Sequence, residues 1–184
     1  MLELLVNTAT FPGVVVHEYA HIVAARSRGL RVLDARLFEP FANPAGYVRH
    51  TPARGNADAL VVGLSPFVVN TALAVAVALL TVPAFELGPW TLLGVLWLAW
   101  SLALHAPPSL DDMGDVSGPA SVALAPLKVL KMAEVVGAGY LFATAVVTAG
   151  AIASLAVFID AATAIAAATQ LVEAVPDVGP ISTR

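Results

Sequence analysis

Long stretches with almost no charged residues constrain this chain most. Only 12% of its 184 residues are charged and 59% are hydrophobic, whereas a soluble globular domain carries about 25% charged residues. A backbone inside lipid must satisfy its own hydrogen bonds, so apolar stretches of about 20 residues fold there as helices. We therefore predict an all-α membrane protein with about four transmembrane helices, at residues 4–25, 57–82, 90–105 and 135–159.

These spans predict one transmembrane domain over residues 1–160, followed by a C-terminal helical tail over residues 161–184. Proline and glycine at positions 83, 88 and 89 predict a short connection between the second and third spans. We expect Asp160 to close the fourth span. The chain has no cysteine, which excludes disulfides and thiolate metal ligands.

The basic residues predict how the chain lies in the membrane. Six of the nine fall between the first and second spans, at positions 26, 28, 31, 36, 49 and 54. The positive-inside rule places this loop in the cytoplasm and both termini outside. Frequent Ala, Val and Arg with scarce Lys are typical of a prokaryotic source. Together with the spans, they predict a multi-pass protein of a prokaryotic cell membrane, with the lipid bilayer as a partner. So few basic residues argue against a nucleic-acid partner.

The basic loop also contains two short stretches that resemble strands. Residues 32–38 and 46–50 flank a turn at residues 43–46, which predicts a short cytoplasmic β-hairpin after the first helix. The alternative is a loop without regular structure. His50 lies on the second predicted strand, where we expect it to be solvated.

The first span carries the sequence His17-Glu18-Tyr19-Ala20-His21, an H-E-x-x-H motif. Residues four apart lie on the same face of a helix, so His17 and His21 can bind one zinc ion. Glu18 can then act as a general base and accept a proton from the attacking water. The alternative is a helix that uses two histidines for polar packing.

A catalytic zinc ion needs a third protein ligand and an open position. No third histidine follows closely after His21. The nearest later carboxylates in the membrane frame are Asp111 and Asp112, just beyond the third span. The alternative for this pair is a solvated turn that caps a helix.

Three blocks of the chain together resemble the site-2 protease family of intramembrane zinc metalloproteases. The first block is the motif at residues 17–21. The second is Gly63-Leu64-Ser65-Pro66-Phe67-Val68-Val69-Asn70, and the third is Pro108-Ser109-Leu110-Asp111-Asp112. The chain departs from the family pattern at Ser65, where a glycine is common, and at Asp112, where the Leu-Asp-Gly block has glycine.

The resemblance implies a role for each block. His17, His21 and one aspartate would bind a single zinc ion, and Glu18 would be the general base. Asp112 fits a divergent branch with the pattern His-x-x-Pro-Ser-x-x-Asp, which matches at four positions, whereas Asp111 fits the Leu-Asp-Gly pattern at two. Asn70 would stabilise an oxyanion or orient the peptide; its alternative is a hydrogen bond between helices.

The function implied is that of a zinc-dependent intramembrane endopeptidase, which hydrolyses peptide bonds in the transmembrane segment of another protein. The hairpin strands would pair with the unwound substrate. The alternatives are a non-catalytic zinc-binding membrane protein of the same fold and a small membrane transporter. Glu18 argues against a mere zinc binder, and the scarcity of polar residues in the later spans argues against a transporter. His105 is expected near the site or at the membrane interface, but not as a ligand.

Overall fold

The computed structural model describes residues 2–109, 112–114, 116–126 and 138–173. In these ranges the chain forms seven helices and one two-stranded antiparallel hairpin, which confirms the mostly helical class. The helices are α1 (Leu2–Ala9), α2 (Phe11–Ser27), α3 (Asn56–Ala78), α4 (Thr81–Leu87), α5 (Pro89–Leu104), α6 (Gly118–Ala123) and α8 (Ala138–Glu173), and the strands are β1 (Val32–Arg36) and β2 (Tyr47–His50).

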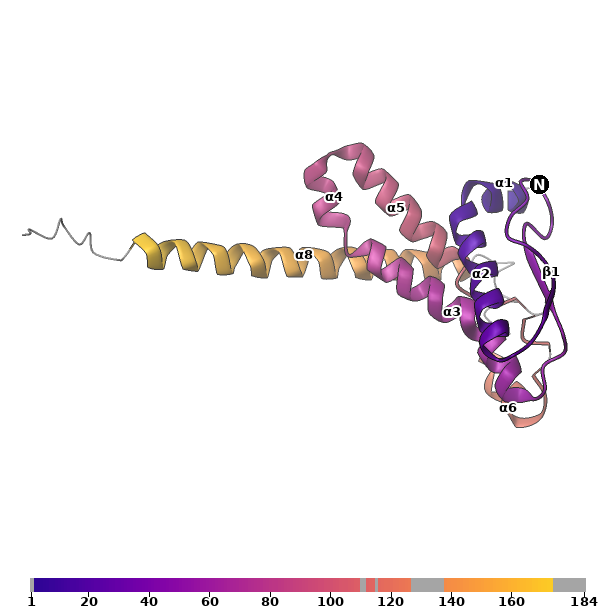
Figure 1. Ribbon diagram of the computed structural model, residues 1–184. Coiled ribbons are helices and arrows are strands. Elements are labelled where there is room, and N and C mark those ends of the chain that lie inside the picture. The colour runs from indigo at the N-terminus through magenta and orange to yellow at the C-terminus, as the bar shows by residue number, and fades with distance from the viewer. Residues whose placement is uncertain (1, 110–111, 115, 127–137, 174–184) are drawn as a thin grey trace, which may run out of the picture.

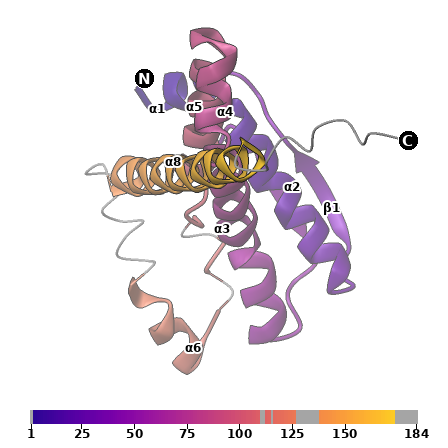
Figure 2. The same cartoon turned by 90° about the vertical axis from the view of Figure 1, so that its left-hand side faces the viewer.

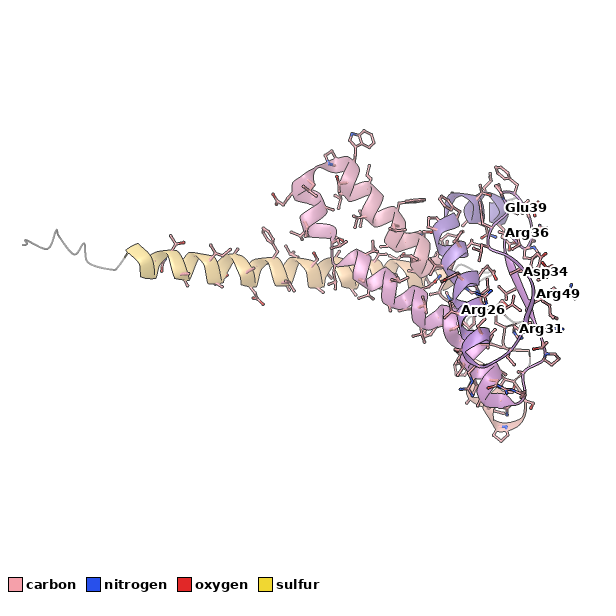
Figure 3. All side chains as sticks on the ribbon, in the orientation of Figure 1. Arg26, Arg31, Asp34, Arg36, Glu39 and Arg49 are labelled. Carbon is pink, nitrogen blue, oxygen red and sulfur yellow. The ribbon has the colours of Figure 1, made fainter. Side chains whose placement is uncertain are left out.

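The hairpin follows the first long helix, as the sequence predicts. Its strands are antiparallel, with Arg36 opposite Tyr47 and Val32 opposite His50. The Tyr47 hydroxyl donates a hydrogen bond to Asp34, and the guanidinium of Arg36 lies 5.4 Å from the centre of the Tyr47 ring. Figure 3 shows the charged side chains of this region along the outer side of β1, away from the helices.

Two helices, α3 and α8, are long and apolar enough to cross a membrane. The 16-residue helix α5 is equally apolar but shorter, and it coincides with the third predicted span. Around these helices, small residues allow close packing. Ala74, Ala103 and Ala143 are fully buried in one cluster that joins α3, α5 and α8.

The first predicted span is divided at Thr10 into two helices. Thr10 has a non-helical backbone conformation, and Pro12 follows in the first turn of α2. Proline is tolerated in a first turn because its missing N–H has no helical partner there. The sequence predicts an interruption of the span over residues 4–25 at Pro12-Gly13, and the structure confirms it: a new helix begins at Phe11, and the motif lies on this second helix.

The predicted short connection between the second and third spans is wrong. Residues 81–87 form helix α4, because Pro83 lies in its first turn, where no backbone donor is needed. Helix α8 runs without a break from the fourth predicted span past the exposed Asp160 to Glu173, since the Ala-rich sequence there favours helix, which agrees with the predicted helical tail. The predicted start of that span, at residues 135–137, lies outside the described residues.

The helices gather at one end of the molecule. In Figure 1, α2, α3 and the hairpin lie together, and α8 passes alongside them before it extends far beyond the bundle. Figure 2, which looks along α8, shows α2 and β1 on one side of it and α6 below. A buried carboxylate connects α3 to the end of α2. Asp58 of α3 accepts hydrogen bonds from Arg28, just after α2 (2.8 Å), and from Arg54, just before α3 (3.1 Å).

Candidate metal centre

Two histidines and one aspartate converge between α2 and the segment after α5. His21 Nε2 lies 3.1 Å from Asp112 Oδ1, and His17 Nε2 lies 3.5 Å from Asp112 Oδ2. Their ligand atoms all lie within 4.8 Å of one another. The structure thus brings together three of the four predicted metal ligands. The fourth, Asp111, lies outside the described residues.

Helix α2 supplies both imidazoles because they are four residues apart on one face, with ring centres 5.0 Å apart. Nδ1 of each ring is hydrogen-bonded to a backbone carbonyl, while Nε2 faces Asp112. His17 Nδ1 donates to the oxygen of His105 (2.7 Å), and His21 Nδ1 donates to the oxygen of Val62 (3.0 Å). Because Nδ1 of each ring is used by a carbonyl, Nε2 is the nitrogen left for a metal ion on the side of Asp112.

The carboxylate is placed by a tight turn after α5. Asp112 Oδ2 accepts a hydrogen bond from the Ser109 backbone N–H (2.6 Å), and Ser109 Oγ accepts one from the Asp112 backbone N–H (3.0 Å). Met113, next in the chain, is fully buried. A Cβ at Gly63 of α3 would collide with the Asp112 backbone oxygen, so only glycine allows this turn to lie against α3.

The electrostatics of the group suit a divalent cation. Burial opposes ionisation of Asp112, but its interactions with His17 and His21 outweigh burial and hold its pKa far below the usual range. Asp112 is therefore an anion at neutral pH. It lies beside two imidazoles whose Nδ1 atoms are already hydrogen-bonded to backbone carbonyls.

The donor set fits zinc. His21 is only 5% exposed, and its Nε2 faces Asp112 Oδ1 at 3.1 Å and has no other polar partner among the described residues. In a tetrahedral zinc site, bonds of about 2.0–2.1 Å place ligand atoms about 3.3 Å apart. The two His–Asp distances bracket that value. Two nitrogens and one oxygen leave a fourth position open, as in catalytic zinc sites.

A cavity of about 350 Å³ opens beside the three ligand groups. Glu18 forms part of its wall, so the predicted general base and the metal group share one space. Another part of the wall comes from β2 and the residues just before it, which lie directly against Glu18, since a Cβ at Gly46 would press on the Glu18 side chain. The hairpin residues that line the cavity are Pro44, Gly46, Tyr47, Val48 and His50.

His50 was expected only to be solvated on its strand, but it also lines the cavity. Its side chain is half-buried in the cavity wall, with Nδ1 hydrogen-bonded to the Thr51 carbonyl oxygen (2.8 Å). Sequence reasoning missed it because the period of a strand shows which residues share a face, but not what that face covers. His105 contributes its backbone oxygen to His17, and its Nε2 is 2.7 Å from Thr10 Oγ1.

Asn70 lies behind the metal group and is not among the residues that line the cavity. Its side chain is fully buried, and its Nδ2 donates to the backbone oxygens of Gly13 and His105, at 3.1 Å each. The structure therefore shows the hydrogen bonds between helices that were its alternative role. Its role at an oxyanion stays a prediction.

Comparisons with known proteins add no identification. No protein-family model matches the chain, and neither a curated protein nor a solved structure matches it.

Proposed function

We propose that this chain is a zinc-dependent intramembrane endopeptidase that hydrolyses a peptide bond in the transmembrane segment of another protein. One observation carries the proposal: Glu18 borders the same cavity as the candidate ligands His17, His21 and Asp112. A site that only stores a metal has no need of a carboxylate beside its open position.

Each residue has a separate task in this proposal. His17, His21 and Asp112 hold the zinc ion, and Asp112 contributes a negative charge that partly neutralises it. Zinc, when bound, supplies Lewis-acid chemistry at the scissile carbonyl and lowers the pKa of water. Glu18 accepts the proton of the attacking water and passes it to the leaving amine, so it acts first as a general base and then as a general acid.

The hairpin supports the choice of an extended peptide as substrate. A transmembrane helix hides its backbone, so it must unwind before a peptidase can reach it. Strand β2 forms one wall of the cavity, and an extended peptide can pair with a strand through backbone hydrogen bonds. In this proposal the chain crosses the membrane about four times, the hairpin is cytoplasmic, and both termini are external.

The test is cleavage of a single-span substrate by purified protein in lipid vesicles, with zinc measured on the same samples. Wild type should cleave, a chelator should abolish cleavage, and added zinc should restore it. Glu18→Gln keeps size and polarity but cannot accept a proton at neutral pH. It should retain zinc and lose about a hundred- to ten-thousand-fold in rate. Equal cleavage by both proteins, with zinc bound, would refute the mechanism.

The same experiment decides between a peptidase and a non-catalytic zinc-binding protein of this fold. Zinc bound stoichiometrically by wild type, without cleavage of any membrane segment offered, would favour the zinc-binding protein. Loss of zinc from Glu18→Gln would make Glu18 part of the metal site itself.

A further inference from the structure

Helix α3 contributes no ligand to the metal group, but one of its backbone carbonyls accepts a hydrogen bond from His21. Pro66 is fully buried inside α3 and has no N–H, so the carbonyl four residues earlier, that of Val62, has no partner in the helix. His21 Nδ1 donates to this oxygen (3.0 Å), and so does Ser65 Oγ (2.8 Å). The proline thus leaves a buried acceptor where His21 needs one.

Asn70, one turn further along α3, acts on the other imidazole. Both hydrogens of its amide are used, one by the Gly13 oxygen and one by the His105 oxygen. Rotating the amide by 180° would turn its oxygen toward two carbonyls, so the hydrogen bonds determine its orientation. The His105 oxygen lies beyond the end of α5, where carbonyls lack helical partners, and it also accepts the bond from His17 Nδ1.

We propose that α3 sets the tautomer and the angle of both metal-binding imidazoles through these two carbonyls. Pro66 acts on His21 by freeing one carbonyl, and Asn70 acts on His17 by fixing the other. Both are positioning residues. This inference rests on the proposed zinc site, and it replaces the oxyanion role of Asn70, whose amide hydrogens are already committed.

The tautomer matters because zinc binds a nitrogen lone pair. When the hydrogen on Nδ1 is bonded to a carbonyl, Nε2 is left to bind zinc on the side of Asp112; the other tautomer would place its hydrogen on Nε2, where the metal must bind. Outer-shell hydrogen bonds of this kind are typically worth ten- to a hundred-fold in metal affinity. Pro66 and Asn70 should therefore affect zinc affinity although neither touches the metal.

The tautomers can be read directly, since the chain has only four histidines. In metal-free protein labelled with ¹⁵N-histidine, NMR shifts assigned with single His→Gln variants should show His17 and His21 protonated at Nδ1. Pro66→Ala restores a backbone N–H that competes for the Val62 oxygen, so His21 should become a mixture of tautomers. Asn70→Leu should do the same to His17. Unchanged tautomers in both variants would overturn the inference.

Zinc affinity gives a second readout, measured in the Glu18→Gln background so that cleavage plays no part. Pro66→Ala and Asn70→Leu should each bind zinc ten- to a hundred-fold more weakly. Two matched controls should bind it as the parent does. Pro83→Ala changes a proline in the first turn of α4, and Ser154→Ala removes a buried hydroxyl that bonds the Leu79 oxygen (2.7 Å) far from the metal group.

The oxyanion role of Asn70 predicts a different pattern. In the Glu18-containing protein, loss of an oxyanion donor would lower kcat about a hundred- to a thousand-fold and leave zinc affinity unchanged. That result would overturn our assignment. If Asn70→Leu fails to fold, Asn70→Asp keeps the size and sets an oxygen against the His105 carbonyl, so the same zinc titration decides. Weakened zinc binding by both variants, with no cleavage by the wild-type protein, would support the inference and count against the peptidase.

Discussion

At the scale of single residues, the metal group combines two parts of the chain that are about 90 positions apart. The histidines come from one turn of α2, and Asp112 comes from the turn after α5. Each imidazole is bonded on one side to a carbonyl and faces the carboxylate on the other. The arrangement leaves Asp112 as the only carboxylate among the described residues that contacts both histidines.

The first prediction separates the two aspartates that the sequence left open. Asp112→Ala removes a ligand and should weaken zinc binding by more than the ten- to hundred-fold typical of an outer-shell change. Asp111→Ala, the matched control, should leave zinc affinity near that of wild type. Zinc titration of both purified variants checks this. The opposite ranking would transfer the ligand role to Asp111.

At the scale of elements, the metal site depends on how closely α2 approaches α5 and how closely α3 approaches the segment after α5. Two glycines mark the tightest approaches: Gly13 of α2 against the Ser101 backbone oxygen of α5, and Gly63 of α3 against the Asp112 backbone oxygen. Ser101 is fully buried and strengthens the first contact, since its Oγ accepts the Gly13 N–H (2.8 Å) and donates to the Thr10 oxygen (2.8 Å). The absence of side chains at these positions lets α5 pack against α2 and lets the Asp112 backbone pack against α3.

The second prediction tests the approach at Gly63. Gly63→Ala should move the Asp112 backbone and weaken zinc binding, because the new methyl group meets a carbonyl oxygen rather than a flexible side chain. Gly94→Ala is the control, since a Cβ there meets nothing within 4 Å. It should raise helix stability by about 0.5–1 kcal/mol and leave zinc binding unchanged. Thermal unfolding and zinc titration of both variants distinguish the two effects.

At the scale of the whole molecule, the metal group and the far half of the long helix α8 lie in different regions. The metal group, its cavity and the hairpin lie at the bundle end, while the far half of α8 extends away from them with exposed side chains (Figure 1). A 36-residue helix is about 54 Å long, which exceeds the hydrocarbon core of a bilayer, about 30 Å. We therefore expect α8 to cross the membrane and to continue beyond it.

The third prediction concerns this topology and uses the lack of cysteines. A single cysteine at Ser27, beside the hairpin, should react with a membrane-impermeant reagent only from the cytoplasmic side. A cysteine at Gln170, near the end of α8, should react only from outside. The positive-inside rule and the arginines around the hairpin give this orientation. Reaction of both positions from the same side would contradict the four-span arrangement.

The sequence by itself determined what depends on neighbours along the chain. The period of a helix places His17 and His21 on one face, and apolar runs predict α3 and α5. The turn at residues 43–46 predicts the hairpin between β1 and β2. These features follow from local spacing, and the structure confirms them. The ends of helices were harder to predict, because residues such as Pro83 and Asp160 end a helix only when the residues around them do not favour helix.

Only the tertiary structure decided which distant groups meet. The family resemblance offered both Asp111 and Asp112 as ligands, but only the fold shows the Asp112 carboxylate beside both histidines, where Gly63 lets its backbone lie against α3. The place of His50 in the cavity wall and the bonds of Asn70 were likewise unpredictable, since their partners come from other elements. The physical reason is that buried polar groups must find hydrogen-bond partners, and the fold alone determines which donors and acceptors are within reach.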